Sequence, residues 1–295
     1  MLFHHGVIAV RDLQRAISTF RDVVGLDARP GGRHGGRGTE NAIIPFADSY
    51  IELLSLFDAG KEIEVSGLRG QVLANYLATH EGGLVGYCLA TRGIFERAEA
   101  LRAAKLLDIP EPLPVSRRTP AGQLLKWHVL LPEGVNWRRP WPFLIQADPA
   151  NPDENASAPK PVHPLGATGV AGIAVAVSDL SRSEALYRLL ELPPAQRDRV
   201  PALGADRLRF IGEGFSIELL APAGPGAVRT EIDAAGEGVF QFSLRVKDIG
   251  QAGAWLARSS IVLLPAPGYP GEHLIPPDRA AGARLALTDA SRPPS

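Results

Sequence analysis

The chain has 295 residues, a formal net charge of −1 and a hydrophobic share of 45%. The near-neutral charge argues against a broad electrostatic surface for nucleic acid, and no apolar run approaches the ~20 residues that span a bilayer. The single cysteine, Cys88, excludes an intrachain disulfide and a cysteine-based zinc site. Because the N-terminus shows no signal-peptide pattern, we expect a cytoplasmic protein of one large or two ordinary domains.

The N-terminal run from Phe3 to Val10 is predicted to be a strand, followed by Asp12 as the N-cap of a helix. Apolar residues recur with helical spacing up to Val24, and Gly25 is placed to end that helix. The rest of this unit is expected to contain a glycine-rich loop, two strands and a helical or irregular segment, at residues 29–39, 41–46, 50–56 and 58–82.

The same strand–junction–helix pattern occurs four times. The four junctions are Val10-Arg11-Asp12-Leu13, Thr91-Arg92-Gly93-Ile94, Val177-Ser178-Asp179-Leu180 and Val246-Lys247-Asp248-Ile249. Each unit combines one helix with several strands, which predicts a βαβββ module. Such a module leaves one sheet face bare, so modules must pair to bury it.

The later modules supply further predicted strands, at residues 122–131, 141–146, 207–211, 215–220 and 284–287. Residues 148–165 are rich in Pro, Ala, Asn and Asp and show no periodicity, so we expect an exposed linker there. The predicted organisation is therefore two halves, residues 1–147 with modules one and two and residues 166–295 with modules three and four.

This pattern resembles the vicinal oxygen chelate superfamily, and its first half resembles the glyoxalase-like domain family. The matching segments are residues 5–13, 31–39, 44–46, 50–53, 83–86 and 142–146. The resemblance implies an α+β fold in which βαβββ modules pair into mixed-sheet cups, as in glyoxalases, bleomycin-resistance proteins and extradiol dioxygenases. It further implies that the second half is a degenerate copy of the first.

In metal-using members of the superfamily, the first strand of a module supplies His or Gln and the last strand supplies Glu. Carried over, module one offers His5 and Glu52, while module two offers Gly86, which has no ligating side chain, and Gln146. The resemblance thus implies His5, Glu52 and Gln146 as ligands of a divalent metal (Zn, Fe, Mn or Ni), with His5 and Glu52 also catalytic. The alternatives are a polar strand-end role for His5 and a buried ion pair with an arginine for Glu52.

The second half offers an incomplete set of the same positions: Gly172, Glu218, Gln241 and Ala286. We interpret Glu218 and Gln241 as remnants of a duplicated cup.

Four further residues are candidates for binding substrate. Arg33, His34 and Arg37 lie in the glycine-rich segment, where arginines can hold a carboxylate or phosphate in a bidentate manner. The alternative is a solvated turn. His128, on a predicted strand of module two, is placed to face the same cup as His5, or else lies at the surface or in the core.

Two classes of function follow. One is a metal-dependent lyase, isomerase or dioxygenase that acts on a small oxygenated metabolite in the N-terminal cup. The other is a metal-free protein of the same fold that binds or sequesters a small molecule. In both cases the expected partner is a small molecule rather than nucleic acid or a membrane, and the chain is expected to be a monomer or a homodimer.

Overall fold

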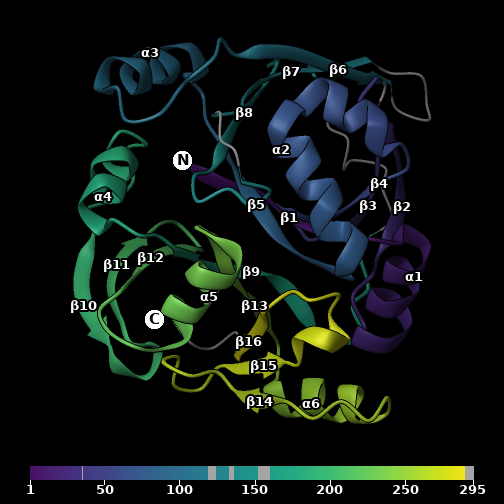
Figure 1. Ribbon diagram of the computed structural model, residues 1–295. Coiled ribbons are helices and arrows are strands. Elements are labelled where there is room, and N and C mark those ends of the chain that lie inside the picture. The colour runs from purple at the N-terminus through teal and green to yellow at the C-terminus, as the bar shows by residue number, and fades with distance from the viewer. Residues whose placement is uncertain (35, 119–123, 133–135, 152–159, 290–295) are drawn as a thin grey trace.

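The computed structural model describes residues 1–34, 36–118, 124–132, 136–151 and 160–289. Its strands form two eight-stranded mixed sheets with the same strand order, one from each half of the chain. One helix, α2, lies in front of the first sheet, and a second, α5, lies in front of the other (Figure 1). No helix within these ranges is long and apolar enough to cross a membrane.

The first sheet has the order β2-β3-β4-β1-β5-β8-β7-β6. Its strands are β1 (Leu2–Val10), β2 (Arg29–His34), β3 (Thr39–Pro45), β4 (Tyr50–Leu56), β5 (Gly82–Ala90), β6 (Leu113–Arg118), β7 (Leu124–Leu130) and β8 (Phe143–Ala147). The helical segments of this half are α1 (Leu13–Ser18), the π-helical turn η1 (Thr19–Val24), α2 (Ala59–Thr79) and α3 (Ile94–Ala104).

The second sheet repeats this arrangement as β10-β11-β12-β9-β13-β16-β15-β14. Its strands are β9 (Ala167–Ala176), β10 (Gln196–Val200), β11 (Ala205–Ile211), β12 (Ser216–Pro222), β13 (Gly238–Val246), β14 (Leu264–Pro265), β15 (His273–Ile275) and β16 (Leu285–Asp289). Its helical segments are α4 (Leu180–Arg188), η2 (Pro201–Leu203), α5 (Ala227–Ala235), α6 (Ile249–Ala257) and η3 (Pro277–Arg279). The predicted fold of paired βαβββ modules in two halves is confirmed.

The junction residues start the helices as the sequence predicts. The side chains of Asp12, Asp179 and Asp248 each accept a hydrogen bond from a backbone N–H in the first turn of α1, α4 and α6. Such caps satisfy donors that a helix otherwise leaves unpaired. Gly25 ends the first helical segment with a φ of +83°, a conformation that glycine adopts without strain.

Successive side chains of β1 point to opposite faces of the first sheet, and the two faces have different surroundings. Val7 and Ala9 pack with Leu73 and Leu77 of α2, and we call this face of the first sheet the first cup. Ile8 and the other residues of opposite parity join a core that contains side chains from both halves. Because one face of β1 is buried against α2 and the other against the shared core, this strand is apolar on both sides.

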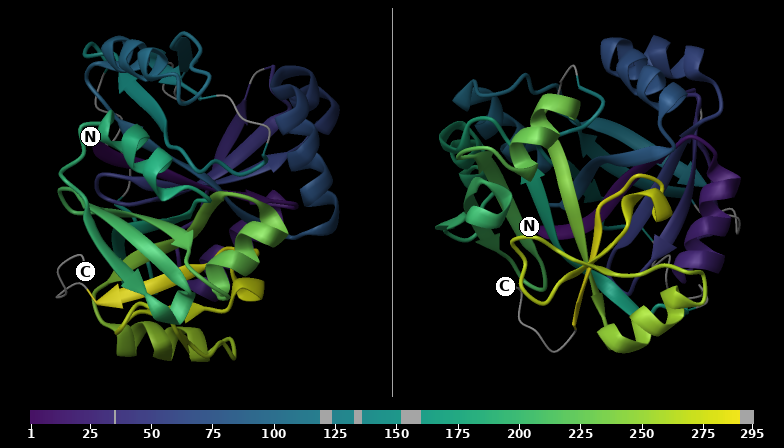
Figure 2. Two further views of the ribbon diagram at one scale, coloured as in Figure 1. Left: turned by 60° about the vertical axis from the view of Figure 1, so that its left-hand side comes forward. Right: turned by 60° about the horizontal axis from the view of Figure 1, so that its bottom comes forward.

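The two sheets meet where β5 lies beside β13, and the two further views in Figure 2 show them joined near the middle of the molecule. A Cβ added to Gly6 would lie 2.4 Å from a ring carbon of Phe242, so this glycine makes room for the other half. The buried hydroxyl of Tyr87 hydrogen-bonds the hydroxyl of Tyr187, which donates to the carbonyl of Pro140 at 2.9 Å.

Residues 160–165, the described end of the predicted linker, lie against the first half. His163 Nδ1 accepts the backbone N–H of Asp27 at 3.0 Å, and its Nε2 lies 2.9 Å from the carbonyl of Pro45. Burial lowers the pKa of His163 from its ordinary value of 6.5. The middle of the predicted linker, residues 152–159, lies outside the described residues.

The glycine-rich segment differs from the predicted loop, because residues 29–34 form the edge strand β2. Its pairing with β3 shifts register between Pro30 and Arg33. A Cβ on Gly31 would lie 2.1 Å from Asn41 Oδ1, so a side chain there would block the close approach of these strands. The strand therefore depends on glycines that, read locally, indicate a turn.

Candidate active site in the first cup

The first cup brings together three of the residues singled out in the sequence: His5, Glu52 and His34. His5 Nε2 lies 3.9 Å from one carboxylate oxygen of Glu52, and His34 Nε2 lies 3.7 Å from the other. His5 is 5% exposed, and the side chain of Glu52 is 13% exposed. Two imidazoles thus face one buried carboxylate.

Neighbouring polar groups hold this arrangement. Asn41 Nδ2 donates to Glu52 Oε1 at 2.6 Å, while Asn41 Oδ1 accepts the backbone N–H of Gly32 at 3.0 Å. His34 Nδ1 lies 2.7 Å from the hydroxyl of Thr39, and its Nε2 lies 3.4 Å from Asn41 Nδ2 and 3.7 Å from Glu52 Oε1. The β2–β3 pairing therefore places His34 and Asn41 on the same carboxylate.

A second group of donor atoms adjoins His5 on its other side. The Nδ1 atoms of His4 and His5 lie 2.7 Å apart, and the possible ligand atoms of His4, His5 and Cys88 all lie within 4.8 Å of one another. Cys88 pairs with His5 across the β1–β5 register, and burial raises the pKa of its thiol well above the ordinary range. A buried, protonated thiol of this kind is inert until something lowers its pKa.

His5 is held as a neutral ring. Burial, reinforced by His4, lowers its pKa well below 6.5, so the contact with Glu52 is not an ion pair at neutral pH. The ring stacks on Tyr50, with centroids 4.5 Å apart, and meets the edge of Phe143 at 5.1 Å. When His5 donates through Nδ1 to His4, its Nε2 presents a lone pair towards Glu52.

Glu52 contrasts with Glu218, which takes the same place in module three. On β4, Glu52 lies opposite Val7 of β1, two residues after His5. On β12, Glu218 lies opposite Ala174 of β9, two residues after Gly172, which is the counterpart of His5. Glu218 is neutralised by Arg207 at 3.3 Å and by Arg209 at 2.7 Å. Among the described residues, no arginine lies within ion-pair distance of Glu52.

The register explains this difference. Asn41 lies opposite Leu54 on β4, and Arg207 lies opposite Leu220 on β12, so Asn41 and Arg207 are equivalent positions. An amide in the first half thus replaces a guanidinium in the second. A buried carboxylate left without a cation is costly, so Glu52 is poised to accept one.

The second module supplies no metal ligand at its own equivalent positions. Val7 pairs with Gly86 and His5 with Cys88, so Gly86 corresponds to His5, as predicted. The stem of Arg139 lies over Gly86, within 3.5 to 3.8 Å of where a Cβ would stand. Phe143 lies opposite Cys88, as Glu52 lies opposite Val7, so the last-strand position holds Phe143 rather than Gln146.

Gln146 and His128 lie on the opposite face of the sheet from His5. Side chains alternate along β8, so Gln146 points away from the face that Phe143 shares with His5, and its Oε1 accepts the backbone N–H of Ile94 at the start of α3. His128 pairs with Gln146 in register and contacts Phe95 of α3. The structure therefore does not bring either residue to the cluster around His5.

The two arginines of the glycine-rich segment are engaged elsewhere. Arg33 is largely exposed, pairs with Glu40 at 3.3 Å and lies over the ring of Phe57. Arg37 donates to Ser66 of α2 at 3.3 Å and lies 3.7 Å from Glu62.

The equivalent face of the second sheet, which carries Glu218 and Gln241 and which we call the second cup, is occupied by its own side chains. Arg207 bridges Asp198 and Glu218, and Gln241 and Ser243 each lie within hydrogen-bond distance of the buried Glu272. This internal pairing agrees with the interpretation of Glu218 and Gln241 as remnants of a duplicated site.

Comparisons with known proteins agree with this architecture. The family model described as "Glyoxalase-like domain" matches residues 3–191, and that described as "Glyoxalase/Bleomycin resistance protein/Dioxygenase superfamily" matches residues 172–276. No curated protein sequence matches the chain.

Two solved structures resemble the whole chain. One is a hypothetical protein from Staphylococcus aureus (16% identity, 97% of this chain and 98% of that chain covered, TM-score 0.64). The other is a mutant 4-hydroxymandelate synthase from Streptomyces coelicolor (14% identity, 99% and 93% covered, TM-score 0.66). At these identities the likeness concerns the fold alone. The family model covers most of the chain, and the chain belongs to the glyoxalase-like domain family of the vicinal oxygen chelate superfamily.

Proposed function

We propose that the first cup binds a divalent transition metal through His5, Glu52 and His34, and that it acts there on a small oxygenated metabolite as a lyase, isomerase or dioxygenase. One observation carries the proposal: Glu52 faces two imidazoles and an amide, whereas its counterpart Glu218 is neutralised by arginines.

The donor types suit such an ion, and each imidazole lies within reach of Glu52. Imidazole and carboxylate ligands bind at about 2.0–2.2 Å, so two ligand atoms on one ion lie at most about 4.2 Å apart. Glu52 lies within this limit of each imidazole separately, at 3.9 Å from His5 through Oε2 and at 3.7 Å from His34 through Oε1. Among the described residues, the three whose possible ligand atoms all lie within 4.8 Å of one another are His4, His5 and Cys88, so one ion shared by His5, Glu52 and His34 requires the two imidazoles to move together on the carboxylate. Two imidazoles with one carboxylate suit zinc, iron, manganese or nickel. A bound metal of this kind supplies Lewis acidity towards the oxygens of a substrate.

The protein's own groups account for the rest of the site. Asn41 fixes the Glu52 carboxylate through Oε1, and no hydrogen bond within the described part of the chain engages Oε2, so this oxygen is available to take a proton from the metabolite. Tyr50 and Phe143 enclose the His5 ring and limit the access of water. The neutral state of His5 keeps its ring nitrogen available to coordinate.

The second candidate is a metal-free small-molecule binding protein, favoured by the second module. Arg139 covers Gly86 and Phe143 takes the last-strand position, so the ligands that a second module would add are replaced by a cation and an aromatic ring. Such a pair suits binding of an organic anion without a metal.

Metal analysis separates the two candidates. Protein purified without a nickel column is loaded with zinc, iron, manganese or nickel, and the bound metal is measured by mass spectrometry. We expect one equivalent in the wild type, loss of that metal in His5→Ala and Glu52→Gln, and full retention in the matched control His128→Ala, which lies on the other face of the same sheet. A wild-type protein that stays empty at saturating metal would refute the metal-dependent function.

A further inference from the structure

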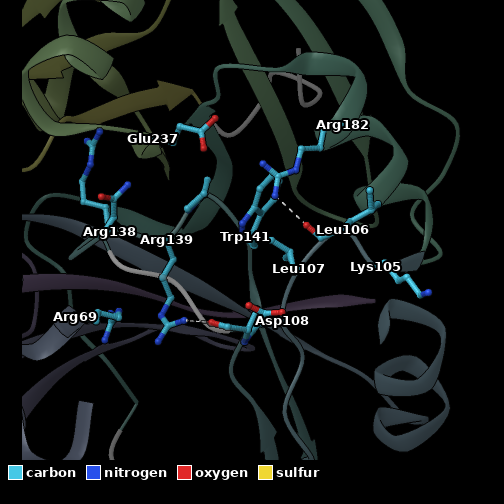
Figure 3. A pocket seen from close by; sticks show the side chains of 13 residues that line it. Arg69, Lys105, Leu106, Leu107, Asp108, Arg138, Arg139, Trp141, Arg182 and Glu237 are labelled. Atoms are coloured by element: carbon cyan, nitrogen blue, oxygen red, sulfur yellow. Dashed lines mark hydrogen bonds between the residues drawn. The ribbon is translucent and has the colours of Figure 1, made fainter. Parts of the chain in front are cut away.

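A cavity of about 370 Å³ lies where the two halves meet, and neither His5 nor Glu52 is among the residues that line it. It is bounded by α2, the segment after α3, the segment before β8, α4 and the residue that precedes β13. Five of its lining residues are cationic, namely Arg69, Lys105, Arg138, Arg139 and Arg182, against the two acids Asp108 and Glu237 (Figure 3). The cavity is therefore strongly biased towards a negatively charged occupant.

Two of these cations already have partners. Arg138 turns towards the second half, where it pairs with Glu231 and donates to the carbonyls of Gly236 and Val239. Arg182 donates to the carbonyl of Leu106 at 2.9 Å.

Arg139 and Arg69 differ, because neither has a carboxylate partner among the described residues. Arg139 donates to the carbonyl of Pro132, and Arg69 donates to the carbonyl of Trp137 at a long 3.4 Å. The Nε of Arg69 is buried without a hydrogen bond among those residues. Burial, together with neighbouring positive charges, lowers the pKa of Arg139 to about 9, and burial lowers that of Arg69 to about 10.

One acid of α2, Glu62, acts electrostatically on both arginines but does not offset both charges. Glu62 accepts a hydrogen bond from Ser66 and lies 3.7 Å from Arg37, so a third arginine shares its charge. Two enclosed guanidinium groups facing a cavity without a carboxylate of their own are unfavourable in the empty protein and favourable once an anion is bound.

We propose that this cavity is an oxyanion-binding site in which Arg139 and Arg69 hold the carboxylate or phosphate group of a small organic anion. Trp141, Leu106 and Leu107 also line the cavity, so the ligand combines its anionic group with an apolar portion. The volume matches a small-molecule site, and guanidinium forks bind both types of oxyanion in a bidentate manner. The site requires no metal. It shares Arg139 with the second candidate function, but its other cationic residue, Arg69, and its apolar lining belong to neither function proposed for the first cup.

The experiment measures anion binding with a chelator present, which separates it from the metal site. Wild-type protein is titrated with inorganic phosphate and, separately, with phenylacetate at constant ionic strength, and thermal midpoint and tryptophan fluorescence are followed. We expect saturable binding of at least one probe, weakened at least tenfold in Arg139→Met. The matched control Arg229→Met, which removes an exposed arginine of α5, should bind like the wild type.

The pattern of binding also identifies the anion. Saturation with phenylacetate but not phosphate assigns a carboxylate ligand with an apolar portion, and the reverse assigns a phosphate ligand. If Arg139→Met fails to fold, Arg69→Met serves as the second variant, with the same expected loss. Absence of saturable binding by the wild type, or equal binding by Arg139→Met and Arg229→Met, would overturn the proposal.

Discussion

The replacement of Asn41 by arginine should convert the first cup into a copy of the second. Arg207, at the equivalent position, lies 3.3 Å from Glu218 and neutralises it. An arginine at position 41 would reach Glu52 in the same way and would replace the amide hydrogen bond that Asn41 now donates. We therefore expect Asn41→Arg to fold with an unchanged or raised thermal midpoint, while losing metal.

The size of the loss follows from the geometry. A guanidinium about 4 Å from the Glu52 carboxylate is attracted by about 4 kcal/mol at an effective dielectric constant of about 20. A metal must overcome that attraction, and about 1.4 kcal/mol corresponds to a factor of ten, so the affinity should fall about a thousandfold. A change to a hydrogen-bonding neighbour that leaves the ligand charge intact typically costs only about 10- to 100-fold.

The assay is calorimetric titration of the apoprotein with zinc and with manganese. Asn75→Arg adds the same charge on the exposed side of α2 and serves as the control, which should keep the wild-type affinity. If Asn41→Arg folds and binds metal as tightly as the wild type, then Glu52 is not a ligand, and its contrast with Glu218 has no bearing on metal binding.

Three further predictions concern the framework around the site. Tyr187→Phe should lower the free energy of unfolding in urea by about 1–3 kcal/mol, because it leaves the Tyr87 hydroxyl buried without an acceptor. Tyr87→Phe should lower it by only about 0.5–1.5 kcal/mol, because the Tyr187 hydroxyl keeps the carbonyl of Pro140 as its partner. Equal losses would contradict donation from Tyr87 to Tyr187. The folded state lowers the pKa of His163, so its contribution to stability should be complete above its ordinary value of 6.5 and decline as pH falls through that value towards the lower folded-state pKa. His163→Ala should remove this part of the pH dependence, and an unchanged profile would show that another group titrates. Gly6→Ala should lose about 1–3 kcal/mol by overpacking against the Phe242 ring, and Phe242→Leu in the same chain should recover most of that loss.

The repeated junctions predicted the fold well because local chemistry decides them. An Asp that ends a strand and caps a helix works through its own first turn, as it does at Asp12, Asp179 and Asp248. Edge strands were harder to predict. The segments of β6 and β10 show no clear alternation, and β2 depends on the close approach of Gly31 to Asn41, a contact between strands.

The site was predicted in part, for the same reason. The sequence identified His5, Glu52 and His34 as candidates, but it did not identify Asn41 or Cys88, whose places depend on how strands pair. The spacing of the first two junctions contains a signal for Cys88, because it makes Gly86 the equivalent of His5 and Cys88 the equivalent of Val7. If β1 and β5 pair around a two-fold axis so that Val7 lies opposite Gly86, then His5 must lie opposite Cys88, as it does. The sequence contains no comparable signal for the last-strand position of module two. The connection before β8 has no counterpart in module one, so the prediction fell on Gln146, three residues beyond Phe143.

Arg139 gives the second module a different route to new specificity. The residue that fills the space over Gly86 comes from the irregular segment before β8 rather than from the sheet. Loops accept insertions and exchanges more readily than central strands do. The charge and shape of this part of the molecule therefore depend on a segment outside the sheet, although Trp137 and Arg138 within it are buried. For protein engineering, the side chain at position 139 is the place to graft new ligand preferences, with the backbone kept as it is, because the N–H of Arg139 donates to the carbonyl of Val85 on β5.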